Sequence, residues 1–337
     1  MALDLDPRHG MHVATTATPA RRHGSVRRTS SIDILRPAGL DGPVHLIGHA
    51  RDLLTAPDGT ASVLRDASTA TVVDYIGGAL VTDVVTDPAL PGARQLIGTR
   101  AASGFRTRLD EALPNERAAR APVFLLLDDI PVTTLISGHV LGAERDPAAH
   151  YRDIPGRGPE VMMGKADLCA GWREGGTIMV QLRTKGTTPP VTGPEAPDIE
   201  DDDPIGWHRM APLPPSAMRR RRRLDVIAAG SELTLDAMFR DSYVTPDGVE
   251  TIIHEYEIKA SVGRTTRTIL ALECTPRVLP WQECPVAAAS GGRLVGEDLG
   301  RVRSLVRGEF TGISTCTHLN DALRSLEDAA ALMLDLP

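Results

Sequence analysis

Alternating apolar and polar residues indicate β-strands in two separate parts of the chain. The first part holds three such segments, rich in β-branched side chains: residues 31–35, 44–54 and 69–85. The second part holds four, joined by glycine-containing turns: residues 219–229, 231–244, 248–261 and 263–275. The second series predicts a four-stranded antiparallel meander.

Helical spacing of apolar residues follows each series of strands. After the first series it covers residues 99–113 and 123–141, with Pro131 at a break or a helix start. After the second it covers residues 294–306 and 316–334. Strands followed by helices predict an α+β protein, in which helices cover one side of a twisted antiparallel sheet.

Two stretches lack such periodicity. Residues 1–23 are poor in apolar side chains, and we expect a disordered arm there. Residues 145–217 are dense in proline and glycine, which is typical of a functional lid or a wrapping linker. We expect this segment to pack across the second half of the chain and to bring Cys169, Trp172 or His208 near Cys316.

The two strand-and-helix units resemble each other in order and in local sequence. RRTSSIDIL parallels RRRRRLDVI, ARDLL parallels FRDSY, and LLLDDIPVTTL parallels CTHLNDALRSL, so that Asp129 falls opposite Asp321. We therefore expect an internal duplication, in which residues 24–144 and 218–337 are two α+β units packed with pseudo-two-fold symmetry.

The two units differ where reactive side chains occur. Cys316 and His318 begin the last helical segment, and opposite them the first unit has Phe124 and Leu126. A thiolate and an imidazole two residues apart can bind one metal ion, and the N-terminus of a helix lowers a thiol pKa. We expect the first unit to be non-catalytic and the second to carry the chemistry.

The second unit also contains His254 and Cys284, which complete a candidate metal site. We expect Cys284, Cys316 and His318 to bind one divalent ion, with His254 or a water in the fourth position. Two cysteines with one or two histidines suit zinc first, with iron or manganese as alternatives. His254 is equally compatible with a structural role, because a buried histidine needs only a hydrogen-bond partner.

Three residues are candidates for catalysis beside this ion. His254 or Glu255 could move a proton, although a glutamate on the other face of the same strand more commonly meets solvent. Asp321, three residues after His318 on a helix, could orient that imidazole. Asp129 at the matching position suggests instead that this aspartate is a feature of the fold.

The run of arginines from Arg219 to Arg223 allows two interpretations. It could clamp an anionic substrate, or it could be neutralised by the acidic run Asp201 to Asp203. We favour the structural interpretation, because alternation along a strand points some of these side chains away from any one ligand.

Composition excludes several classes of function. A net charge of −7 over 337 residues argues against nucleic-acid binding. The longest apolar runs are shorter than a membrane span, and an export signal is not evident, so we expect a cytoplasmic protein with reduced cysteines and no membrane contact. Glycine motifs for nucleotide binding are missing, so we expect a small-molecule substrate and no nucleotide cofactor.

The sequence carries two resemblances. The motifs RRTSSIDILRP, RRRRRLDV, AMFRDS, HEYEI, LPWQECP and CTHLNDALR resemble a bacterial family of unknown function. Residues 249–334 are similar to the U-type iron-sulfur cluster assembly scaffold, which implies ligand roles for Cys284, Cys316 and His318. The scaffold's remaining cysteine has no match here, and its last-helix ligands are adjacent, whereas here they are spaced Cys-x-His.

These observations leave three functional hypotheses. The first is a metal-dependent lyase or hydrolase that uses its ion as a Lewis acid on a small organic substrate. The second is a carrier or scaffold for a metal or an iron-sulfur cluster. The third is a non-catalytic binding module with vestigial ligands. The long central segment, as a lid, favours the enzyme.

Overall fold

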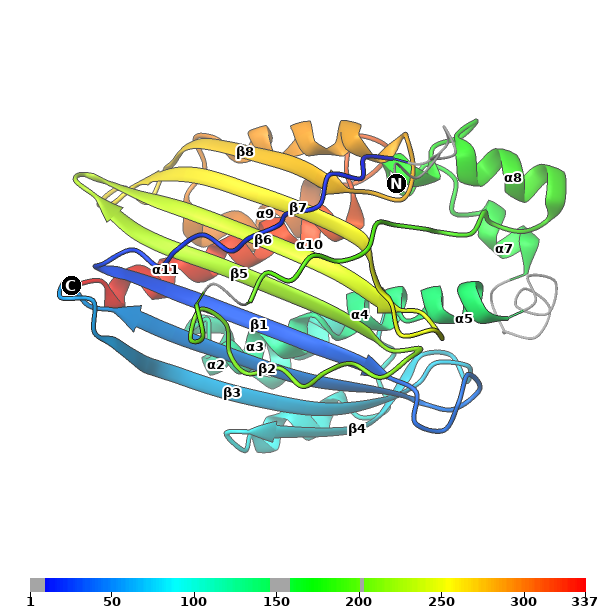
Figure 1. Cartoon of the computed structure of the whole chain (residues 1–337), viewed down its shortest axis with the longest axis horizontal. Helices are drawn as coiled ribbons and strands as arrows, with labels where there is room; N and C mark the ends of the chain where they lie inside the picture. The colour runs from blue at the N-terminus through cyan, green and yellow to red at the C-terminus, as the bar shows by residue number, and fades with distance from the viewer. Residues whose placement is uncertain (1–9, 146–157, 201–202) are drawn as a thin grey trace.

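One antiparallel sheet of eight strands forms the centre of the protein (Figure 1). The computed structural model describes residues 10–145, 158–200 and 203–337. The strands are β1 (Ser25–Leu35), β2 (Val44–Thr55), β3 (Ala61–Asp74), β4 (Leu80–Asp87), β5 (Met218–Ala229), β6 (Glu232–Val244), β7 (Glu250–Gly263) and β8 (Ile269–Val278). Their order is β4-β3-β2-β1-β5-β6-β7-β8, so two meanders join through β1 and β5.

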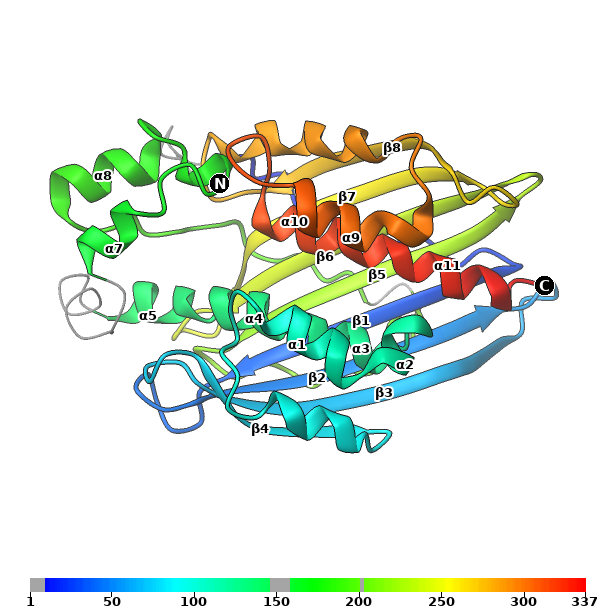
Figure 2. The same cartoon turned by 180° about the vertical axis from the view of Figure 1, so that it is seen from behind.

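Helices cover one face of this sheet, as the sequence predicts (Figure 2). Under the first meander lie α1 (Phe105–Ala112), α2 (Pro114–Ala118), α3 (Pro122–Asp128), α4 (Ile130–Ile136) and α5 (Gly138–Glu144). Under the second lie α9 (Val302–Glu309), α10 (Thr317–Ser325) and α11 (Ala329–Leu332), with 3₁₀ segments η3 (Cys284–Leu294) and η4 (Leu299–Arg301). Between the meanders in sequence come α7 (Pro159–Met163) and α8 (Thr177–Lys185). The fold is therefore a mixture of helices and antiparallel strands.

Extended segments cross the other face of the sheet (Figure 1). Residues 10–23, which we expected to be disordered, run along it and bond to the end of β8: the Val13 amide donates to the Arg277 carbonyl (2.8 Å), and the Leu279 amide donates to the Met11 carbonyl (2.9 Å). Backbone hydrogen bonds replace the apolar contacts that this arm lacks. With helices behind and these segments in front, β1 and β5 are buried on both faces.

The arginines of β5 are all buried and all paired with carboxylates. Side chains of Arg219 to Arg223 alternate between the faces, and their respective partners are Asp33, Asp241, Glu200, Asp129 and Asp236. Charges removed from water need such partners. The partners differ from the predicted acidic run: Asp203 pairs with Arg21, and Asp201 and Asp202 lie outside the described residues.

Apolar side chains form one core under each meander. The first contains Leu46, Phe105 and Leu127, and the second contains Tyr256, Leu294 and Leu319. Burying one such leucine side chain contributes about 1.5–3 kcal/mol to folding. Within the described residues, no single helix is long and apolar enough to cross a bilayer, and only the pair Pro122–Asp128 and Ile130–Glu144, bent by 42°, satisfies that test together.

Candidate metal centre

Two neighbouring strands place a carboxylate opposite an imidazole. Asp241 on β6 pairs in register with His254 on β7, next to an irregularity in the ladder at Ser242. The His254 Nδ1 atom lies 3.3 Å from Asp241 Oδ2. Asp241 is completely buried, so its charge must be balanced inside the protein.

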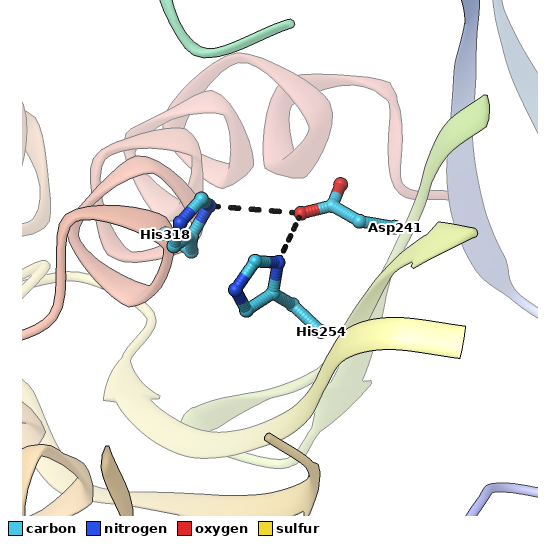
Figure 3. A group of neighbouring side chains, drawn as sticks. All are labelled: Asp241, His254 and His318. Atoms are coloured by element: carbon cyan, nitrogen blue, oxygen red, sulfur yellow. Dashed lines mark ion pairs between the residues drawn. The ribbon is translucent and has the colours of Figure 1, made fainter. Parts of the chain in front are cut away.

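A second imidazole reaches the same carboxylate from the helical layer (Figure 3). His318 is the second residue of α10, and its Nδ1 atom lies 3.7 Å from Asp241 Oδ2. The two imidazole rings are stacked, with centroids 3.8 Å apart and an interplanar angle of 20°. Sheet and helix thus bring two histidines to one face of Asp241.

Arg220 controls the charge of this group. Its guanidinium donates two hydrogen bonds to Asp241, at 2.6 and 2.8 Å. Burial alone would raise the pKa of Asp241, but the charge and hydrogen bonds of Arg220, together with His254, outweigh burial and hold that pKa well below its usual range. Burial, together with the neighbouring His254, lowers the pKa of His318. At neutral pH the site therefore contains a carboxylate and a neutral imidazole at His318.

The donor atoms fit a metal ion. Among the described residues, Asp241, His254 and His318 are the one group of three whose ligand atoms lie within 4.8 Å of one another, and neither Nδ1 atom has a hydrogen-bond partner. Donors bound about 2.0–2.1 Å from a tetrahedral ion are about 3.3–3.4 Å apart, close to the 3.3 and 3.7 Å observed.

The predicted cysteine ligands lie in the same cavity but outside this group. Cys284 and Cys316 line the cavity beside His254 and His318. Cys316 is the N-cap residue of α10, where we expected a lowered thiol pKa. Burial instead raises the pKa of Cys316 to about 12, because desolvation outweighs the hydrogen bonds from the helix N-terminus. Burial also raises the pKa of Cys284.

Arginines hold both of the predicted catalytic carboxylates. Glu255 is completely buried and pairs with Arg240, and it accepts a hydrogen bond from the Thr15 amide on the face opposite the helices. Its side chain therefore lies on the opposite face of the sheet from that of His254, and it is not exposed to solvent. Asp321 pairs with Arg106 and Arg324, and these arginines overcome the effect of burial and lower its pKa. Both carboxylates have structural partners.

A cavity of about 330 Å³ opens beside the histidines, and the segment after residue 157 closes one side of it. Cys169 and Trp172 from this segment line the cavity together with Cys316, as we expected. The Ala170 amide donates to the Thr315 carbonyl (2.9 Å), which fixes the segment next to α10. His208 lies elsewhere, buried between Thr29 and Ser31 of β1.

Sequence reasoning found both histidines and missed Asp241. The missed signal was the PDG turn at residues 246–248. Counting outward from Asp247 along an antiparallel hairpin places Asp241 opposite residue 253, and the ladder irregularity shifts the partner to His254. The FRDS motif therefore held the third member of the group.

Comparison with known proteins gives one match. Residues 218–332, which span the second meander and the helices after it, match the family described as "Protein of unknown function (DUF2889)". The match includes Asp241, His254 and His318, whereas the first meander lies outside it. No curated protein and no solved structure matches the chain.

Proposed function

We propose that this protein is a metal-dependent enzyme whose divalent ion is bound by Asp241, His254 and His318. Two imidazoles and one carboxylate leave coordination positions for water or substrate, which is the arrangement of catalytic zinc and non-haem iron sites. Zinc, iron and manganese all accept this donor set. The adjoining cavity, lined mainly by apolar side chains, suits a small organic substrate.

The proposal is supported by a comparison of the two meanders, which we infer to be copies of one duplicated unit. Arg27 pairs with Asp225 at 2.6 and 2.9 Å, and Arg219 pairs with Asp33 at the same two distances across the β1–β5 ladder. A two-fold axis between β1 and β5 would superpose one of these ion pairs on the other.

A second pair of contacts repeats in the same way. Arg28 binds Asp52 at 2.6 and 2.8 Å, as Arg220 binds Asp241. The residue opposite Asp52 in the β2–β3 ladder is Arg65. We infer from this that Arg65 corresponds to His254.

The exchange of Arg65 for His254 is the observation that carries the proposal. In the first unit Arg65 donates to Asp52 at 2.7 Å, so that carboxylate has two arginine partners, which also pair with Asp328 and Asp335. At the corresponding place in the second unit lies an imidazole whose buried Nδ1 atom faces Asp241 and has no hydrogen-bond partner among the described residues. A bound cation would supply the charge that the second arginine supplies in the first unit.

The remaining residues of the cavity have separable roles in this proposal. The ion, when bound, would act as a Lewis acid on a substrate oxygen or on water, which suits a lyase or a hydrolase. Arg220 keeps Asp241 ionised and fixed in orientation. His139 lines the same cavity, and burial lowers its pKa to about 4, so it is neutral at pH 7.

Metal analysis of matched variants tests the proposal. We expect about one equivalent of zinc, iron or manganese in the purified full chain. His254→Ala and His318→Ala should reduce metal content to roughly one-tenth or less, whereas Cys284→Ala and Cys316→Ala should retain it. Circular dichroism shows whether each variant is folded. If Cys284→Ala, Cys316→Ala and His318→Ala lose the ion and His254→Ala keeps it, the ligand set of Cys284, Cys316 and His318 is correct instead.

One observation favours a second candidate, a carrier or scaffold for an iron-sulfur cluster. Cys169, Cys284 and Cys316 line the same cavity, and thiolates are the ligands of such clusters. All three are buried under the segment after residue 157, so transfer to a partner would require this segment to open. Iron together with acid-labile sulfide in the purified protein would support the carrier over the enzyme.

A further inference from the structure

A second cavity, of about 450 Å³, adjoins the first. It lies between α4, the segment 100–106 and α10, and three residues line both cavities: Leu135, Lys165 and Thr317. Thr317 directly precedes His318, so the junction lies next to the candidate metal centre. A ligand in the first cavity can therefore extend past the histidines into the second.

The second cavity is rich in positive charge. Its lining contains four cationic side chains, those of Arg100, Arg106, Lys165 and Arg324, and one carboxylate, Asp321. Arg106 and Arg324 are already bound to Asp321 and to Asp128 below it. The Lys165 ammonium lies at the junction, 5.7 Å from the centre of the Trp172 ring.

Arg100 stands apart from this network. Its side chain is exposed, and within the described residues it has neither an ion pair nor a hydrogen bond. No carboxylate among the described residues neutralises its guanidinium, in contrast to those of Arg106 and Arg324 in the same lining. Arg100 and Lys165 together present two cationic groups to the same space.

A buried hydroxyl points to the same ligand. Thr134 on α4 lines this cavity, its side chain is 1% exposed, and its Oγ1 atom has no hydrogen-bond partner among the described residues. Buried hydroxyls are normally satisfied, and threonines within helices usually donate to a carbonyl of the preceding turn. A ligand oxygen would accept this hydrogen bond.

We propose that the second cavity binds an anionic group, a carboxylate or a phosphate, of a substrate whose apolar part occupies the first cavity. Arg100 and Lys165 supply the charge, and Thr134 donates a hydrogen bond. The inference rests on the proposed function for placing the reacting bond near His254 and His318. The substrate class is then an amphipathic acid or phosphate ester of small size.

Ligand titrations of the full chain test this inference. Octanoate, octyl phosphate and 1-octanol share one alkyl chain and differ in the head group. Binding is followed by the fluorescence of Trp172 and Trp281, which line the first cavity. Each titration is made on protein treated with EDTA and on protein reloaded with zinc, because an anion can also bind a metal ion directly.

We expect both anions to bind more tightly than octanol in either form of the protein. Arg100→Gln and Lys165→Gln should each weaken the anions on the order of threefold to tenfold and leave octanol unchanged. Arg301→Gln is the matched control, because Arg301 is an exposed arginine outside both cavities. Tighter binding of octanoate than octyl phosphate, or the reverse, identifies the head group.

Two results would overturn the inference. One is equal affinity for the alcohol and the anions, or no saturable binding of either anion. The other is an equal effect of Arg100→Gln and Arg301→Gln. Failure of the proposed function gives a different result, in which the protein lacks metal but still distinguishes anions from octanol in a manner sensitive to Arg100.

Discussion

At the scale of single residues, Asp241 belongs to two systems. It is the acceptor in the buried pair with Arg220, and it faces His254 and His318. Asp52, which we propose as its counterpart in the first meander, has two arginines and no histidine. Under this proposal the same aspartate position is structural in one half of the protein and binds a ligand in the other.

Asp241→Ala should destabilise the protein by about 3–5 kcal/mol, because it leaves the guanidinium of Arg220 buried without a partner. Urea unfolding followed by circular dichroism measures this loss. Asp52→Ala is the matched control, because it also breaks a buried pair while leaving the histidines intact. We expect similar losses of stability in both variants and loss of metal only in Asp241→Ala. Equal metal content in the two would contradict a ligand role for Asp241.

His208 should make the fold sensitive to acid. Burial, with His49 and nearby arginines, lowers its pKa well below the ordinary value of 6.5. A histidine with a depressed folded-state pKa stabilises the protein fully above pH 6.5, and this contribution is lost as the pH falls below that value. Each unit of depression corresponds to about 1.4 kcal/mol.

Urea midpoints at pH 8 and pH 5 check this prediction. His208→Gln should have a smaller decrease in midpoint between the two pH values than the unsubstituted protein. Carboxylates and other histidines titrate in both proteins, so only the difference between them reports on His208. An unchanged pH dependence would show that His208 does not control acid stability.

The sequence predicted part of the site for physical reasons that can be stated. Histidine is a residue type that binds metals, so both histidines were candidates, and the rings of His254 and His318 lie together. The pairing of Asp241 with His254 depends on strand register, which sequence periodicity leaves undefined. The prediction of a thiolate at Cys316 was based on the helix N-terminus, which lowers a thiol pKa. Burial raises that pKa and is the larger effect.

At the scale of elements, the segment after α8 is attached to the sheet by backbone contacts. The Ile252 amide donates to the Pro194 carbonyl, and Glu195 forms a bridge with Thr251 of β7. These contacts extend the edge of the sheet beyond the end of β8. Residues 194 and 195, which follow α8, are thereby held against β7 at Ile252, two residues before His254.

Gly193→Ala should detach this segment. A Cβ atom at residue 193 would lie 1.7 Å from the Ile252 carbonyl oxygen, so the backbone would have to move. We expect a loss of stability of several kcal/mol, on the order of an overpacked core, and faster proteolysis after α8. Gly308→Ala is the control, because its Cβ meets no atom within 4 Å and alanine favours a helix. Equal cleavage rates in both variants would refute this role.

Periodicity predicted the strand-rich and helix-rich regions, and it failed where tertiary contacts decide. The stretch 69–85 was expected as one strand segment, whereas the structure divides it between β3 and β4. Residues 10–23 lack apolar periodicity and are nevertheless held, because Arg21 pairs with Asp203 and Thr15 binds Glu255. Such partners are distant in sequence, and no local pattern reports them.

At the scale of the whole molecule, charged residues join the two halves. Arg222 of β5 reaches Asp129 at the end of α3, and Arg303 of α9 reaches Asp128. Both aspartates are buried. The family match begins at residue 218, yet the strand that starts there is completed by partners from outside the matched range.

Residues 218–337 expressed alone should therefore not fold cooperatively. Without residues 1–217, one edge of β5 has no neighbouring strand, and Arg219 and Arg222 lose their partners Asp33 and Asp129. Co-expression with residues 1–217 should restore a stable complex, seen by size-exclusion chromatography and a single unfolding transition. A cooperative transition of the isolated fragment would show that each half is an independent domain.

The pair of Arg220 and Asp241 also constrains how such a protein can change over generations. Under the proposed role, a substitution that alters the ligand at position 241 leaves an arginine without its counter-charge, so it is acceptable only when position 220 changes as well. A change in the opposite direction, toward loss of the ion, can begin at His254, because the residue that we propose to correspond to it in the first unit is Arg65. A single replacement, His254→Arg, would recreate the arrangement of two arginines around Asp52, so loss of the proposed activity requires one substitution, whereas a change of ligand at position 241 requires two.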